Sequence, residues 1–308
     1  MVPVIAHTVP VLLLVLLGVW LRRAPRTPEG FFPAIEWFTF YVAFPALLFV
    51  NTAQLDVSGA QLRDLTAATL LPTLLFAAAV ALVLPLARGL PDASRSSVIQ
   101  GATRPSTYFG LSVAALVFER ETAALVMLAL AICLPAVNVI AVVALTRWSG
   151  RPAGPGRIAR ALAGNPIIVA TAAGAAVNLS GLPLPGALVH ALDILGAAAL
   201  ALGLVCVGGG LVFDWSASRP AALAATSALK LLALPLVAVS ACRLLGASEA
   251  VTAASCFYAA LPTASNAYIM ARQMGGDAPL MAALITLQTL LAVVTVPLAM
   301  RLPAWFAG

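Results

Sequence analysis

The segment RWSGRPAGPGRIAR, residues 147–160, is the longest and most basic interruption in a chain that is otherwise almost continuously apolar. It carries four arginines, and its glycines and prolines disfavour a continuous helix. Apolar runs long enough to cross a bilayer lie on both sides of it. We count five runs before the segment and five after it, so the sequence predicts two parts, residues 1–150 and residues 151–308.

The ten runs have the length of membrane-spanning helices, which need about 20 predominantly apolar residues each. They are too long for the strands of a membrane barrel and do not alternate between polar and apolar positions. The sequence therefore predicts an all-α polytopic membrane protein. We expect its spans near residues 3–21, 33–54, 66–87, 97–118, 122–146, 161–180, 187–212, 220–242, 250–271 and 279–300.

The composition fits a membrane environment. Of the 308 residues, 62% are hydrophobic and 9% are charged, and the mean hydropathy is +1.04. Soluble domains carry about 25% charged residues, so this chain has too few charges to cover a surface in water. Ten spans with short connections leave no length for a large soluble catalytic domain, a nucleotide-binding cassette or a long regulatory tail.

The net charge of +6, from 17 basic and 11 acidic residues, reflects membrane topology rather than nucleic-acid binding. One set of alternate connections holds eleven basic residues, whereas the other set, with the C-terminal end, holds four. Because positive residues are enriched in cytoplasmic loops, we expect the basic side to be cytoplasmic and both termini to face outward. The eleven are Arg22, Arg23, Arg26, Arg88, Arg95, Arg147, Arg151, Arg157, Arg160, Arg219 and Arg272.

Neither an enzyme nor a metal protein is indicated. The four cysteines, Cys133, Cys206, Cys242 and Cys256, lie inside apolar runs without the spacing of metal ligands, so we interpret them as small buried residues. The sequence has no HExxH, GxSxG or Walker-type motif. We therefore expect no enzymatic activity, no cofactor and no metal.

An odd number of spans in each part makes the second part enter the membrane in the opposite sense to the first. Inverted repeats are a recurring plan of secondary transporters, whose substrate is held near the midplane by helices broken at matching positions. The fourth span of each part carries such a break, TRPST at 103–107 and LPTASN at 261–266. Each proline frees backbone groups that lipid cannot satisfy, so we expect the opened helix ends to face a ligand.

Two positive residues lie at membrane depth, whereas deep carboxylates are scarce. Arg104 lies inside the fourth span and Lys230 near the middle of the eighth. Such a charge costs about 2.5–3.5 kcal/mol on insertion scales and usually faces a cavity or a partner. The balance favours an anionic ligand, and a purely structural pairing is the alternative. The candidate substrate-binding residues are Arg104, Pro105, Ser106, Thr107, Lys230, Pro262, Thr263, Asn266, Asn51 and Asn138.

Six segments, in order along the chain, carry a resemblance to a known family. On these segments the chain resembles a bacterial member of the auxin efflux carrier family, which includes plant PIN-type carriers and bacterial malonate and malate permeases. The resemblance covers nearly the whole length. The segments are FYVAFPALLFVNTAQLD (40–56), GATRPSTYFGLSVAALVFE (101–119), GNPIIVATAAGAAVNLSGLPLP (164–185), ALDILGAAALALGLVCVGGGL (191–211), SALKLLALPL (227–236) and AALPTASNAYIMARQMGGD (259–277).

The resemblance implies two inverted five-helix repeats, with broken helices that cross at spans four and nine. It also implies transport of a small organic anion, either a dicarboxylate such as malonate or malate or an aromatic carboxylate, across a bacterial inner membrane. Spans 3–5 and 8–10 would move as an elevator against a scaffold of spans 1, 2, 6 and 7, in a homodimer. A proton, sodium or the membrane potential alone are the open alternatives for coupling.

The chain departs from the family pattern in span four. Pro105 stands where members usually have Asn, and Ser112 where they usually have a later Pro. These departures predict a break displaced by about two helical turns and the loss of one amide that would contact the substrate. They also support an alternative function, a membrane receptor or interaction protein that keeps the carrier fold without transporting. An intramembrane enzyme is the weakest alternative, because the sequence offers no pairing of a nucleophile with a base.

Overall fold

The computed structural model describes residues 2–54, 59–149, 156, 163–164, 166–211, 219–264 and 266–305. This part of the chain is built from helices, and its one extended pairing is an isolated bridge between Pro105 and Thr263. The prediction of an all-helical protein is confirmed for these residues. Most of the basic segment 147–160, with the predicted boundary at residue 150, lies outside them.

The helices follow the predicted apolar runs. Before the basic segment lie α1 (Val2–Arg23), α2 (Phe31–Phe38), the π-turn η1 (Thr39–Ala43), α3 (Phe44–Ala53), α4 (Gly59–Val83), the short turn η2 (Leu84–Leu86), α5 (Asp92–Thr103), α6 (Thr107–Val117) and α7 (Arg120–Ser149). After it lie α9 (Pro166–Ser180), α10 (Gly186–Gly209), α11 (Pro220–Ala228), the π-turn η3 (Leu229–Ala233), α12 (Leu234–Leu244), α13 (Glu249–Ala260), α14 (Asn266–Met274), α15 (Ala278–Ala299) and α16 (Leu302–Trp305).

Within the described residues, six helical stretches are long and apolar enough to cross a membrane. Two further predicted spans, 97–118 and 250–271, are each divided into two shorter helices, so length alone does not identify them. The membrane class is supported, while the count of ten spans and the inverted repeat stay predictions. The six stretches are Phe31–Val50, Gln61–Leu86, Arg120–Trp148, Gly186–Gly209, Pro220–Leu244 and Ala278–Trp305.

Two of these stretches contain a π-turn just before a proline, η1 before Pro45 and η3 before Pro235. Proline lacks a backbone donor and its ring collides with the preceding helical turn. A π-turn is a local widening of the helix that is frequent at functional positions. The turn η3 bears on function because it carries Lys230.

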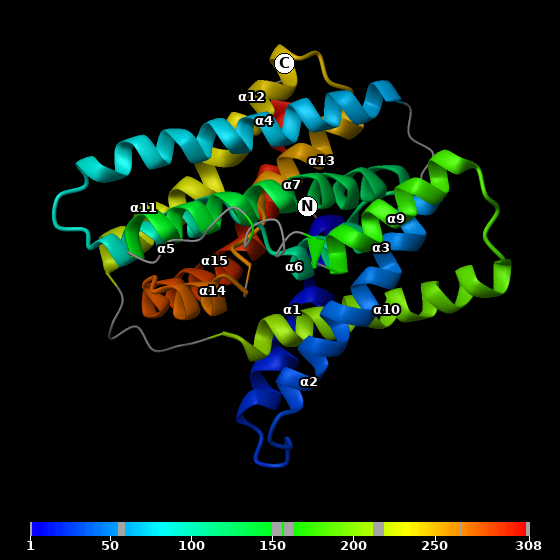
Figure 1. The fold of residues 1–308 in the computed structure, drawn as a ribbon, viewed down its shortest axis with the longest axis horizontal. Coiled ribbons are helices and arrows are strands. Elements are labelled where there is room, and N and C mark those ends of the chain that lie inside the picture. Colours follow the sequence, from blue (N-terminus) through cyan, green and yellow to red (C-terminus); the bar gives the residue numbers. More distant parts are fainter. Residues whose placement is uncertain are drawn as a thin grey trace.

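Packing divides the helices into two groups (Figure 1). In one group, α1, α2, α3, α9 and α10 contact one another, most extensively α3 with α9 and α1 with α10. The other group contains α4 to α7 and α11 to α15, with α7 packed against α4, α5, α6 and α13. The groups meet mainly where α6 packs against α10 and α1. Both broken spans therefore belong to the second group.

Glycines bring α1 and α10 into close contact. A Cβ atom at Gly208 would overlap the backbone carbonyl of Val15, and one at Gly18 would overlap the carbonyl of Val205. Such close backbone approach through small residues is common between helices in membranes, where no hydrophobic force drives association. The pair α1–α10 thus forms a tightly packed unit of the first group.

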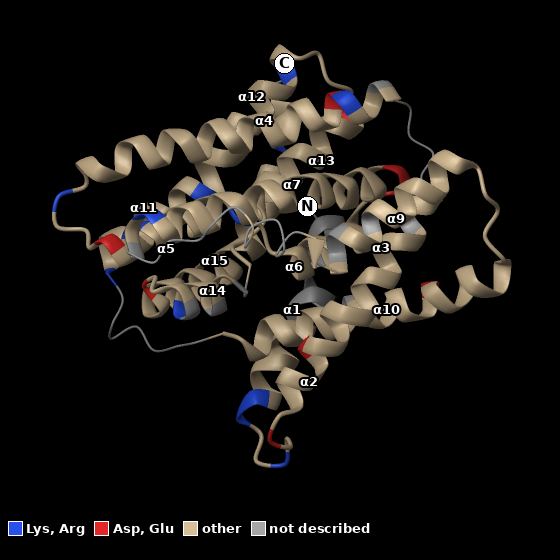
Figure 2. Cartoon of the chain, in the orientation of Figure 1, with Lys and Arg blue, Asp and Glu red and all other residues tan. Residues whose placement is uncertain are grey.

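Charged residues lie mainly at helix ends and in connections, and the helix bodies are largely uncharged (Figure 2). This distribution is expected of a protein whose helix bodies face lipid or one another, because a charge at depth is costly. Exposed large hydrophobic side chains along the helices, such as Leu82, Leu244 and Val294, fit the same environment. The orientation of the termini across the membrane stays a prediction.

Candidate functional site

Both predicted breaks are present as short extended segments between two helices. The helix α5 ends at Thr103, and the next residues run extended until α6 begins at Thr107. The proline at 105 disfavours the helical conformation of the preceding residue, and Arg104 accordingly has φ −84° and ψ 117°. The break lies at Pro105, about two helical turns before Ser112, and α6 runs unbroken through Ser112. The displacement expected relative to the family pattern stays a prediction.

The second break follows α13, which ends at Ala260. Leu261 is extended, with φ −62° and ψ 138°, and α14 begins at Asn266. Here too the residue before a proline leaves the helix. Gly110 of α6 lies against this break, since a Cβ atom there would come within 2.6 Å of the Leu261 side chain.

The two breaks cross and bond to each other. Pro105 and Thr263 form the isolated antiparallel bridge, and the Ser106 N–H donates to the Pro262 carbonyl at 2.7 Å. Residues that are far apart in sequence are thus joined through backbone groups that proline had released from helical bonding. Four of the predicted site residues, Pro105, Ser106, Pro262 and Thr263, are brought together at this crossing.

A glutamine that the sequence analysis did not select holds the crossing. The Gln288 side chain of α15 accepts from the Thr263 N–H at 3.0 Å and donates to the Gly101 carbonyl at 3.1 Å. The Thr263 hydroxyl lies 2.8 Å from the Gly101 carbonyl and 2.7 Å from Gln288 Oε1. We name this network of Gly101, Thr263 and Gln288 the clasp. The hydroxyl of Thr263 is therefore engaged within the protein.

Arg104 and Asn138, both predicted site residues, lie together. The guanidinium of Arg104 donates through Nη2 to Asn138 Oδ1 of α7 at 2.8 Å, and Nη1 contacts the Met270 sulfur of α14. The side chain is buried, with 3% of Arg104 exposed. Both partners are uncharged, so the positive charge has no anion to balance it in this contact.

Lys230 is buried more completely than Arg104 and makes fewer polar contacts. It is fully buried, and among the described residues its Nζ atom finds no hydrogen-bond partner. The Nζ atom lies 6.0 Å from the centroid of the Tyr258 ring on α13. A cation over an aromatic face gains about 0.5–2 kcal/mol, which is small beside the cost of burying an ammonium group.

The remaining predicted residues have different positions. Ser106 caps α6, where its Oγ accepts from the Phe109 N–H at 3.4 Å. Thr107 is the partly exposed first residue of α6. Asn51 lies in α3 and Asn266 opens α14, and their side chains fall outside those that the structure describes. The N-termini of α6 and α14 bring positive helix ends to the crossing.

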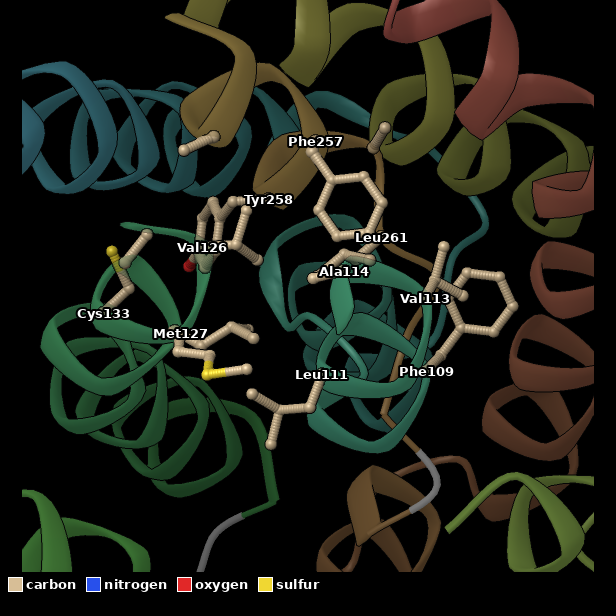
Figure 3. Close-up of a cluster of buried hydrophobic side chains, with 14 of the residues drawn as sticks. Phe109, Leu111, Val113, Ala114, Val126, Met127, Cys133, Phe257, Tyr258 and Leu261 are labelled. Carbon is tan, nitrogen blue, oxygen red and sulfur yellow. The ribbon is translucent and has the colours of Figure 1, made fainter. Parts of the chain in front are cut away.

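A buried apolar cluster lies on helices that flank the two breaks (Figure 3). Side chains of α6, α7 and α13, among them Leu111, Met127 and Phe257, pack into one buried cluster. Phe257 also meets Phe118 edge to face, with ring centroids 5.1 Å apart. Apolar packing of this kind lowers the local dielectric constant, which strengthens charge interactions next to it.

Comparison with known proteins supports the family expected from the sequence. Residues 157–300 match the family model described as "Membrane transport protein", which confirms the resemblance over that range. The range contains Lys230, Pro262, Thr263 and Asn266. None of the curated proteins matches the chain.

Proposed function

Because residues 157–300 match the family model described as "Membrane transport protein", we propose that the chain is a secondary transporter of a small organic anion in a bacterial inner membrane. The substrate would be a dicarboxylate such as malonate or malate, or an aromatic carboxylate. It would bind near the midplane, beside the crossing of the α5–α6 and α13–α14 breaks. The observation that carries this proposal is the pair of buried cations, Arg104 in the first break and Lys230 on η3.

The balance of buried charges favours an anionic substrate. Arg104 is bonded to neutral atoms and Lys230 to none, and the salt bridge found in the described residues joins Arg95 to Asp92 at a helix end. Two buried positive charges without acidic partners are costly unless a bound anion offsets them. The positive N-terminal ends of α6 and α14 add to the attraction for a carboxylate.

The two helix groups support an elevator movement. Both breaks, Arg104 and Lys230 belong to the group of α4 to α7 and α11 to α15, so a substrate bound there could travel with that group against α1 to α3, α9 and α10. Where the groups meet, Phe44 of α3 stacks on Tyr108 of α6 with ring centroids 4.8 Å apart. We propose that these groups are the scaffold and moving parts of ten spans in two inverted repeats, assembled as a dimer.

Counterflow in liposomes tests the proposal. Purified protein would be reconstituted with unlabelled malonate inside, and uptake of labelled malonate would be measured with and without competing aliphatic and aromatic carboxylates. We expect saturable exchange that one subset of carboxylates inhibits. The Arg272→Gln protein, changed at an exposed arginine of α14, should exchange malonate at the wild-type rate. The Lys230→Met protein should exchange it more slowly.

Two results would contradict the proposal. Folded protein that exchanges no carboxylate of the panel would exclude this transport activity, and carboxylate binding without exchange would favour the receptor alternative. Wild-type rates and affinity in Lys230→Met and Asn266→Ala proteins would separately remove these residues from the site.

A further inference from the structure

Buried polar atoms without partners gather on two neighbouring helices, α5 and α11 with η3. Gln100, Thr226, Ser227 and Lys230 are at most 4% exposed. In the part of the chain that the structure describes, the Gln100 amide oxygen and nitrogen, both hydroxyls and the Lys230 ammonium have no hydrogen-bond partner. Buried polar groups are normally paired, so several unpaired ones on adjacent helices require an explanation.

These residues come from helix turns that lie against each other. A Cβ atom at Gly101 of α5 would come within 2.9 Å of the Thr226 side chain, and α5 also packs against η3. The turn with Gln100 and Gly101 therefore adjoins the turn with Thr226 and Ser227. Lys230 follows Ser227 by three residues, which places them on the same side of a helix.

The cluster adjoins the crossing but is distinct from the clasp. The Gly101 carbonyl accepts from both Thr263 and Gln288, so the clasp begins one residue after Gln100. Every polar atom of the clasp side chains has a partner, whereas those of the neighbouring cluster find none among the residues that the structure describes. The clasp thus has the bonding of a structural element, whereas the cluster consists of donors and acceptors that the described residues leave unpaired.

The chemistry of the unpaired atoms matches one ligand type. Gln100, Ser227 and Lys230 offer amide, hydroxyl and ammonium donors, and a carboxylate is an acceptor with four lone-pair positions and the opposite charge. Within the described residues, the titratable groups that interact with the lysine are the Cys133 thiol of α7 and the Tyr258 phenol of α13. Neither of them is an acid that would replace an external carboxylate.

We propose that Gln100, Ser227 and Lys230 form the subsite that binds the carboxylate group of the transported anion. The proposal rests on the function proposed above and adds the position of the charged group and two binding residues. Arg104, already bonded to Asn138 and Met270, then holds α5, α7 and α14 together beside the subsite. Binding satisfies the donors and removes the unbalanced charge at Lys230.

The sequence offers a direct probe, because Lys230 is the only lysine among the 308 residues. Protein made with [13C]lysine gives one side-chain Cε signal, which needs no assignment. Titration of the purified wild-type protein with malonate at constant ionic strength should move this signal saturably. Malonamide, which has the same skeleton without charge, should not move it.

Matched variants distinguish a loss of malonate binding at the subsite from a general loss of folding. Removing a charged hydrogen bond typically costs a factor of about 10 or more in affinity, so Lys230→Met should weaken malonate binding, measured by ligand-induced thermal stabilisation, by at least about tenfold. Ser227→Ala and Gln100→Met should weaken it about three- to tenfold. The control is Ser240→Ala, an exposed serine of α12 whose hydroxyl donates to the Leu236 carbonyl at 2.8 Å, and it should bind like wild type.

The outcomes distinguish this inference from the proposed function. Malonate counterflow without any movement of the lysine signal would overturn the subsite and leave transport intact. A saturable movement without counterflow by any carboxylate would support the subsite and overturn transport. No movement with malonate, benzoate or acetate would overturn the subsite whether or not the variants fold, since that titration uses the wild-type protein.

Discussion

Replacing Gln288 with leucine should loosen the crossing of the two broken helices, because its side chain bonds both of them. The change removes the acceptor of the Thr263 N–H and a donor to the Gly101 carbonyl. The carbonyl keeps the Thr263 hydroxyl at 2.8 Å, but the N–H is left buried without an acceptor. Two interhelical bonds at about 0.6–1.5 kcal/mol each, with about 1–3 kcal/mol for the orphaned donor, give a loss of about 2–6 kcal/mol.

Thr263→Val provides the internal comparison. Valine keeps the shape and removes the hydroxyl, while Gly101 and Gln288 Oε1 each retain another donor. The expected loss is about 1 kcal/mol, so the order of the two variants is the critical result. The double variant should cost less than the sum, since both single changes remove the same hydroxyl contact at 2.7 Å.

Unfolding of purified protein in detergent, followed by tryptophan fluorescence against temperature and against denaturing detergent, measures these differences. Val294→Ala on the same helix is the control, because Val294 is 61% exposed and should contribute little. A Thr263→Val loss equal to or larger than that of Gln288→Leu would refute the argument. It would mean that the threonine hydroxyl, rather than the glutamine, holds the crossing.

Three further substitutions test separate contacts. Asn138→Leu leaves Nη2 of Arg104 without its acceptor at 2.8 Å and should cost about 1.5–3 kcal/mol of unfolding free energy, with a lower thermal midpoint. Gly208→Ala forces a Cβ atom into backbone and should lower the midpoint sharply, whereas Gly186→Ala, where nothing lies within 4 Å, should not. Ser106→Ala removes the cap of α6 and should cost about 1 kcal/mol, measured by the same denaturation; no loss would show that the cap is not used.

The positions of the breaks could be predicted from sequence because they follow from local chemistry. A proline inside an apolar run removes a donor and disfavours the helical conformation of the preceding residue, yet Pro72 and Pro135 lie inside continuous helices. At Pro105 and Pro262 the helix does break, as the neighbouring hydroxyl, amide and arginine side chains indicated, and the family resemblance implied that the two broken helices cross. The same local rule explains why Ser112, which is no helix breaker, lies in continuous helix.

The partners at the site could not be predicted in this way, because they depend on which helices pack together. Gln288 and Gln100 are single amides in apolar surroundings, and nothing local shows that one completes a network while the other stays unpaired. Thr263 was expected to bind a ligand, yet its hydroxyl lies within bonding distance of two protein oxygens. Only the relative placement of α5, α13 and α15 shows which of these polar side chains are paired within the protein and which are not.

The division between paired and unpaired polar residues has a physical reason at the proposed binding site. Backbone opened by proline is tolerated at depth only where other groups satisfy it, so the crossing needs polar side chains for its own integrity. A residue bonded in this way changes little when a ligand arrives and contributes rigidity rather than affinity. Binding energy must therefore come from groups that the protein leaves unsatisfied, and Lys230 with its unpaired neighbours meets that condition. If transport depends on Thr263 and Gln288 only through stability, but on Lys230 through affinity at unchanged stability, the division between clasp and subsite is correct.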